Sequence, residues 1–309
     1  MSDRCTRRCD AGRPVRRRTV RGRGVVVGYK EALGALVAAA PPDSGVRSLV
    51  RPGAAGLVSE HAERSGLLRR RTTVAPQVTS SYVGGHPFQP DDAEWPQDVD
   101  GWPMHFVLQV AFADVPALPG FPREGMLQMF VRDDPMHGLT FDDTAGTRGL
   151  LCRWYDAAAL AQPVEVTSTT SAFTSDDSPL ADPQHPVELE FVAIPMLPLG
   201  WENLADDVAG APEAFEALEE LLEKREDLVE GLEQAVEESG RWSGVHVGGW
   251  PSFVQSAPDV PAYAASQLLV GMSGGLFRWG DVGSAHLFGD PAAVAAGDLS
   301  QLWWEWASH

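Results

Sequence analysis

The stretch that decides the fold runs from Ser80 to Val131 and reads SSYVGGHPFQPDDAEWPQDVDGWPMHFVLQVAFADVPALPGFPREGMLQMFV. Its first part is a loop that is stiffened by Gly84-Gly85, which reach positive φ at little cost, and by prolines that force each preceding residue into extended geometry. From Met104 to Phe112 large apolar residues alternate with other residues, which predicts a strand. Residues 125–131 predict a second strand, and the short connection between the two favours an antiparallel pair.

The same order of motifs returns near the C-terminus. His246-Val247-Gly248-Gly249-Trp250-Pro251 repeats the V-G-G-x-P of residues 83–87, and the segments 267–270 and 283–288 follow as 107–110 and 125–130 do in the first series. One interpretation is a degenerate internal duplication, with repeats at residues 80–135 and 242–290. The alternative is that Gly-Gly-x-Pro loops before strands are simply common. A shared strand order in the two segments would favour duplication.

Two ordered series of motifs resemble the YwqG-like family of bacterial proteins: VGGHPFQP, EWP, DGWPMHFVLQVAF and LPGFPREGMLQMF, then HVGGWPSFVQ, RWGDVGSAHLF and DLSQLWWEW. The resemblance covers residues 80–135 and 242–306, and it implies one compact, β-rich α+β domain in the bacterial cytoplasm. The family has no established activity, so the resemblance implies no catalytic residues. One departure concerns the strand at 267–270. The family tends to end this strand with an acidic residue, whereas here Gly271-Met272-Ser273-Gly274-Gly275 follows.

Charge is unevenly distributed along the chain. The net charge is −19, but residues 1–24 hold nine Arg and two Asp, a local charge of +7 that leaves −26 for the remainder. A body this acidic repels nucleic acid and anionic membrane, and it favours a basic protein as partner. Solubility alone is the plainer explanation of the same charge.

Residues 1–24 contain almost no apolar residues, so they predict a disordered basic arm. A targeting segment and a start codon assigned too far upstream are the alternatives. Lys30 and Glu31 interrupt the apolar run that an export signal needs. Because three cysteines are too few for a disulfide framework, the chain suits a reducing compartment, and we expect a cytoplasmic location.

The remaining pattern predicts an α+β fold, predominantly antiparallel β, as a single domain over residues 25–309. Residues 211–238 predict one long amphipathic helix whose apolar stripe is interrupted at Arg225. Near the C-terminus we expect a closing strand that buries Trp304 beside Leu302 and Trp306, with Trp303 on the other face. Further expected elements are a short helix at 29–40 and strands at 150–155, 164–170 and 187–191.

No residue set predicts catalysis, a cofactor or a metal. Residues 271–275 match the G-x-S-x-G of hydrolases, but no helical pattern begins after Ser273, as a nucleophile elbow requires. The eight histidines include no H-x-x-x-H spacing, and no C-x-x-C occurs, so a zinc site has no local support. We therefore predict no catalytic residue and no cofactor.

Two candidate surfaces remain. The first is a binding cleft between the two repeats, and the alternative is that each of its residues braces a turn. Its residues are Gly84, Gly85, His86, Trp102, Gln109, His246, Gly248, Gly249, Trp250, Gln255, Gln267 and Asp281. The second is an acidic docking face on the long helix, formed by Glu219, Glu223 and Glu230. A solvated helix face is the alternative there.

The interpretation that we favour is a non-enzymatic cytoplasmic protein that binds a basic protein partner. Its most specific form is an immunity-like neutraliser of a basic toxin. One alternative is a small-molecule-binding protein that uses the Gly-Gly-x-Pro clefts, and another is a hydrolase or metal enzyme. The sequence leaves the oligomeric state open.

Overall fold

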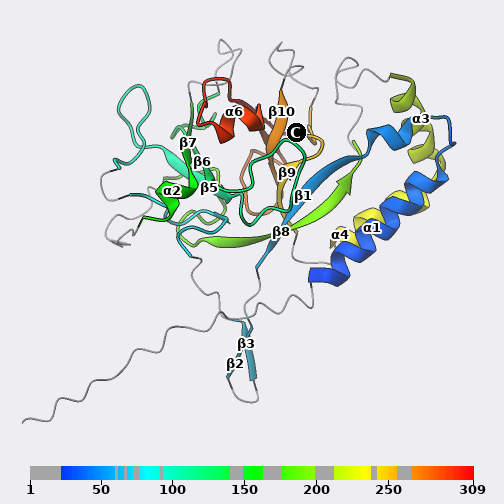
Figure 1. The fold of residues 1–309 in the computed structure, drawn as a ribbon, viewed down its shortest axis with the longest axis horizontal. Coiled ribbons are helices and arrows are strands. Elements are labelled where there is room, and N and C mark those ends of the chain that lie inside the picture. Colours follow the sequence, from blue (N-terminus) through cyan, green and yellow to red (C-terminus); the bar gives the residue numbers. More distant parts are fainter. Residues whose placement is uncertain are drawn as a thin grey trace, which may run out of the picture.

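Ten antiparallel strands form the main sheet of the computed structural model (Figure 1). Along the sheet their order is β12-β11-β10-β9-β1-β8-β4-β5-β6-β7. The strands are β1 (Arg51–Val58), β4 (Tyr82–Val83), β5 (His105–Ala111), β6 (Met126–Val131), β7 (Leu150–Tyr155), β8 (Val187–Met196), β9 (Trp242–Gly248), β10 (Gln267–Ser273), β11 (Ser284–Gly289) and β12 (Trp303–Ala307). Two further strands, β2 (Ala62–Ser65) and β3 (Leu68–Arg71), form a separate hairpin. The predicted class, a single α+β domain that is mostly antiparallel β, is confirmed.

The helices are α1 (Gly22–Ala39), the 3-10 helix η1 (Val46–Leu49), α2 (Ala157–Leu160), α3 (Pro212–Lys224), α4 (Glu226–Glu237) and α6 (Pro291–Ala295). The structure describes residues 22–59, 62–65, 68–71, 77–90, 93–139, 149–162, 175–198, 212–237, 242–255 and 266–309. Most of the expected basic arm and the expected strand at 164–170 lie outside these residues, while α1 begins within the expected arm.

The sheet has two halves with the same internal order. The antiparallel pair of β1 and β8 joins them, and the order outward is β8-β4-β5-β6-β7 on one side and β1-β9-β10-β11-β12 on the other. Each half contains a meander, β4 to β7 in the first and β9 to β12 in the second. Each meander also has a register shift at the same place, because Leu108 pairs with Met129 and Val270 with Leu287, each directly after the shift. A shared order and a shared irregularity are what an internal duplication would produce. The pairing makes Leu108 the counterpart of Val270, whereas the sequence patterns align Val110 with Val270.

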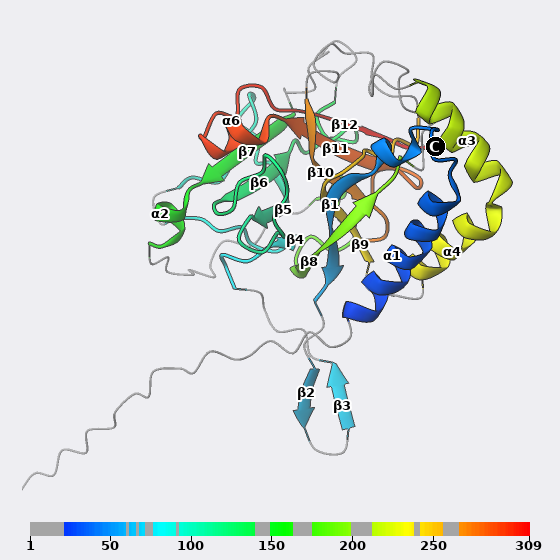
Figure 2. The same ribbon diagram turned by 45° about the vertical axis from the view of Figure 1, so that its right-hand side comes forward.

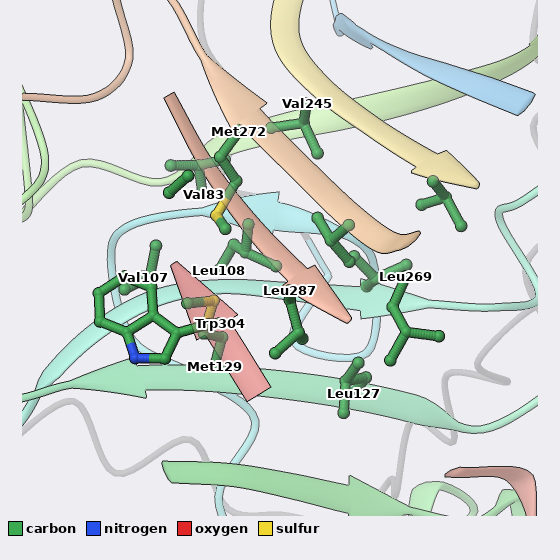
Figure 3. Packing of buried hydrophobic residues seen from close by; sticks show 14 of the residues in the cluster. Val83, Val107, Leu108, Leu127, Met129, Val245, Leu269, Met272, Leu287 and Trp304 are labelled. Atoms are coloured by element: carbon green, nitrogen blue, oxygen red, sulfur yellow. The ribbon is translucent and has the colours of Figure 1, made fainter. Parts of the chain in front are cut away.

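These register shifts decide which side chains reach the core. Strict alternation puts Phe106 and Leu108 on one face, but the register shift between them puts Phe106 on the opposite face, where it is buried in a separate small cluster. Val107, Leu108 and Val110 all enter the central cluster between the two meanders. In this cluster side chains from β5 and β6 pack against those from β10, β11 and β12 (Figure 3). The two meanders therefore bury their inner faces against each other.

A second cluster lies on the outer face of β1, β8 and the second meander, and it packs against the helices. In both views α1, α3 and α4 lie together beside β1 and β8 (Figures 1 and 2). Leu33 and Leu36 of α1, Leu218 of α3 and Leu232 of α4 are all buried in this cluster. The helices thus cover the half of the sheet that the meanders leave open.

The prediction of a single long helix needs a correction. The segment forms two helices that separate at Arg225, whose guanidinium binds Asp227 at 2.9 Å. A cation in the apolar stripe is costly to bury. The chain therefore bends there, and α3 and α4 each present an apolar face of their own to the body.

The closing strand is confirmed. Trp304 and Leu302 lie in the central cluster, and Trp306 packs against it. Trp303 points to the opposite face and stacks on Phe288 with ring centroids 4.4 Å apart.

Candidate functional site

The two Gly-Gly turns have the same backbone conformation. Gly84 and Gly85 have φ values of 68° and 71°, and Gly248 and Gly249 have 66° and 79°. A Cβ on Gly85 would lie 2.7 Å from Pro186 Cβ, and one on Gly249 would collide with Met196 Sδ. Positive φ and close packing therefore both require glycine at the second position of each turn.

In the first half, two glutamines hold the loop that leaves the turn. Gln109 Oε1 accepts the Phe88 N–H at 2.9 Å, and Gln109 Nε2 donates to Ser80 O at 2.7 Å and to Val78 O at 2.9 Å. Gln128 Nε2 donates to Phe88 O at 2.7 Å. Both glutamines are fully buried. These hydrogen bonds satisfy Gln109 and the Gln128 amide nitrogen, while Gln128 Oε1 is buried without a partner. They fix the path of the loop across the sheet.

In the second half, two histidines contact the loop that leaves the turn. His286 Nε2 accepts the Ser252 N–H at 3.0 Å, so that nitrogen carries no proton, and Nδ1 donates to Glu305 Oε1 at 2.5 Å. His246 Nε2 lies 3.2 Å from Trp250 O, and its ring fills the space where a Cβ of Gly271 would lie. Burial and the proximity of His286 lower the pKa of His246 to about 4. His246 is therefore neutral at physiological pH.

The pairing register relates these residues one by one. Tyr82, Gln109, Gln128 and Arg153 form a row across β4 to β7, and His246, Gly271, His286 and Glu305 form the matching row across β9 to β12. The Tyr82 hydroxyl donates to the carbonyl of His86, just as His246 contacts that of Trp250. Each row, apart from Gly271, is a polar brace beneath its loop, as the turn-bracing alternative expects.

The two turns do not form one cleft. Val83 pairs with Val187 at the start of β8, whereas Gly248 pairs with Gly53, which pairs with Ile194 near the end of β8. At the usual rise per residue these points are about 23 Å apart along β8. Gln109 on β5 and His246 on β9 also lie in different halves of the sheet, with β4, β8 and β1 between them, so they occupy separate sites.

The other predicted cleft residues are dispersed. Trp250 is buried, donates to Leu49 O at 2.7 Å and stacks under Arg51. His86, Gln267 and Asp281 are exposed, as is Gln255, whose amide binds Ser308 O at 2.6 Å. Trp102 is also exposed, in the loop before β5. Only the bracing residues are brought together, in two sets.

Sequence reasoning missed Gln128, His286 and Glu305. The first two stood at matching positions of the aligned segments 125–130 and 283–288, and that alignment was a usable signal. Their role emerges only from the register, which places each beside a residue of the preceding strand.

A further polar cluster surrounds the buried His105. Its Nε2 lies 2.7 Å from Asp133 Oδ1 and 3.3 Å from Ser175 Oγ, and Ser175 also binds Asp133. Ser175 and Asp133 share the same ring nitrogen, unlike a hydrolase triad, in which the acid binds the other nitrogen. The described residues contain no group of three or more His, Cys, Asp or Glu side chains that could hold a metal ion.

Of the predicted acidic face, Glu223 on α3 and Glu230 on α4 are exposed, and Glu219 is half-buried. Lys224 pairs with Glu220 at 2.6 Å, and Arg225 pairs with Asp227. Lys224 and Arg225 therefore pair with carboxylates outside the predicted face.

The family model that matches this chain is the domain of unknown function DUF1963, over residues 81–307. The chain belongs to this family. The match begins just before the first Gly-Gly turn and ends with β12, so the DUF1963 domain spans both meanders with their polar braces. No curated protein matches the chain.

Among the described residues of this DUF1963 protein, no helix is long and apolar enough to cross a membrane. A shallow depression of about 270 Å³ lies between the end of β7 and the end of α6, and it is lined by Trp154, Tyr155, Asp156, Ala159 and residues 295–297. None of the predicted cleft residues lines it.

Proposed function

We propose that this DUF1963 protein is of the YwqG-like kind and is a non-enzymatic cytoplasmic protein that binds a basic protein partner. One observation carries the proposal: polar side chains of the predicted cleft bind the protein's own backbone. Gln109 and His246 hold backbone groups of the two loops, so they are engaged in folding. What the molecule offers to a partner is therefore its exposed surface.

That surface is acidic where the helices lie outermost. Along α3 and α4 exposed carboxylates outnumber the two cations, Lys224 and Arg225, and both cations are engaged with neighbouring acids. The chain outside residues 1–24 carries a charge of −26. Complementary charge speeds the encounter with a basic protein and disfavours acidic competitors. The most specific form of the proposal is an immunity-like role, in which this surface covers a basic toxin.

The small-molecule alternative has less support. The two Gly-Gly turns lie about 23 Å apart along β8. The polar side chains beside each turn are bound to the backbone of the adjoining loop. The hydrolase alternative is also weaker, because Ser273 ends β10 and a turn follows it.

The test measures association with a partner captured from the native cytoplasm and then purified. Reversing Glu219, Glu223 and Glu230 to Lys should slow association several-fold and flatten its salt dependence. The control variant reverses two exposed acids elsewhere, Glu124 and Asp281, to Lys. For both variants the change in association rate is expressed per reversed charge before the two are compared. An equal effect of both sets would mean that only net charge matters and that α3 and α4 are ordinary solvated helices.

A further inference from the structure

The hairpin tip before β5 holds two of the most exposed large apolar side chains of the described residues. Trp102 is 67% exposed and Val99 is 78% exposed. Both lie between Gln97 and Pro103, which form an isolated antiparallel bridge. An exposed tryptophan on a short tip adds nothing to the core, so its presence needs another explanation.

The tip is held rigidly by its own hydrogen bonds. Asp98 Oδ1 accepts the N–H groups of Asp100 and Trp102, both at 2.9 Å, and Asp98 N donates to Trp102 O at 2.8 Å. Gly101 completes the turn with a φ of 84°. Just before the tip, Trp95 Nε1 donates to Met104 O at 3.0 Å. Such a tip presents its indole without further ordering, and this lowers the entropy cost of binding.

The surroundings of the tip are acidic. Arg132, at the end of β6, pairs with Asp100 at 2.7 Å, Asp98 at 3.2 Å and Asp134 at 3.3 Å. Three carboxylates around one guanidinium leave an excess of negative charge. Asp98 is buried, so Asp100 and Asp134 are the ones that reach solvent. Beyond Asp134, Met136 is 42% exposed and extends the apolar surface.

From these features we infer that the tip formed by Val99, Asp100 and Trp102 is the contact surface for a cationic segment, rich in Lys or Arg, of the basic partner. This inference rests on the proposed function and adds a second contact, apart from the acidic face of α3 and α4, for the same partner. A cation is attracted to the face of an indole, and most strongly when the contact excludes water. Asp100 and Asp134 add complementary charge beside the ring. Tryptophan is also the residue type most enriched where truncation weakens an interface.

The experiment titrates the full chain with a short synthetic peptide rich in Arg and Lys, and with the same peptide carrying Glu at each cationic position. Affinity is measured for wild type, Trp102→Ala, Trp102→Phe and Val282→Ala. Val282 is the matched control, because it is 77% exposed but lies outside the tip. Fluorine-labelled tryptophan gives a local readout, and the Trp102 signal is assigned from the Trp102→Phe variant.

We expect Trp102→Ala to weaken binding of the cationic peptide roughly tenfold, Trp102→Phe to weaken it less, and Val282→Ala to leave it unchanged. The Trp102 signal should shift during the titration. Unchanged affinity in Trp102→Ala together with a silent Trp102 signal would overturn the inference. The proposed function would stand if the Glu219, Glu223 and Glu230 reversal then weakened binding. A wild-type protein that bound neither the cationic peptide nor a basic partner would overturn both.

Discussion

Gln128 and His286 occupy equivalent positions in the two halves of the sheet, and each binds the backbone of the loop that leaves its Gly-Gly turn. Gln128 Nε2 donates to Phe88 O at 2.7 Å, and His286 Nε2 accepts the Ser252 N–H at 3.0 Å. Phe88 and Ser252 follow their turns at the same distance in sequence. The two halves thus keep the contact while they differ in residue type and in the direction of the hydrogen bond.

This equivalence predicts how substitutions at the two positions will behave. Gln128→Met keeps the volume but leaves Phe88 O without its donor, which should cost about 1–3 kcal/mol. His286→Ala should cost at least as much, because it also leaves Glu305 without its partner. His286→Gln should recover part of that loss, since Gln is the residue that works in the other half. Denaturant unfolding of the four proteins tests the order, and equal stability of His286→Gln and His286→Ala would contradict the equivalence.

His246 makes stability depend on pH. Its pKa is lowered to about 4 in the folded protein, against a usual value near 6.5. Between these values the unfolded chain binds a proton that the folded chain does not, so stability is complete above pH 6.5 and falls as the pH drops towards 4. The loss is at most about 3 kcal/mol from this group. Denaturant unfolding at several pH values should show that the free energy of unfolding falls less steeply with decreasing pH in His246→Gln than in the wild type. An identical fall would contradict the lowered pKa of His246.

Gly249 should tolerate no side chain, whereas Gly101 should tolerate one at moderate cost. Both have positive φ, but a Cβ on Gly249 would collide with Met196 Sδ, while nothing lies within 4 Å of one on Gly101. Gly101→Ala should therefore cost about 1 kcal/mol, from backbone strain alone. Gly249→Ala should cost clearly more, because Met196 must also move. The difference between the melting temperatures of the two variants measures the cost of the clash with Met196. A negligible difference would show that the Met196 side chain moves aside at little cost.

Much of the fold could be predicted because it depends on local patterns. The alternation in β12 correctly placed Trp304 and Trp303 on opposite faces of the sheet, and the Gly-Gly motifs marked both turns. The face of Phe106 could not be predicted, because one register shift reverses the alternation and no residue type announces such a shift.

The candidate site was harder to predict for a topological reason. The residues beside each turn gave no hint that β4 and β9 run in opposite directions, with β8 and β1 between them. That arrangement separates Gln109 from His246 and makes two braces where one cleft had been expected. The break at Arg225 was visible in the sequence as an interrupted stripe, but its consequence depended on the body against which α3 and α4 pack.

Ser273 should not act as a nucleophile. It is the last residue of β10, and the chain then turns through Gly274, with Phe277 N donating to Gly274 O at 3.0 Å, so no helix follows to stabilise an oxyanion. The histidine of the neighbouring strand, His286, is also engaged, since its Nε2 already accepts the Ser252 N–H. Ser273→Ala should therefore leave folding and partner binding unchanged, and a fluorophosphonate probe should not label the wild-type protein. Labelling that disappears in Ser273→Ala would instead establish a reactive serine and bring the hydrolase interpretation back.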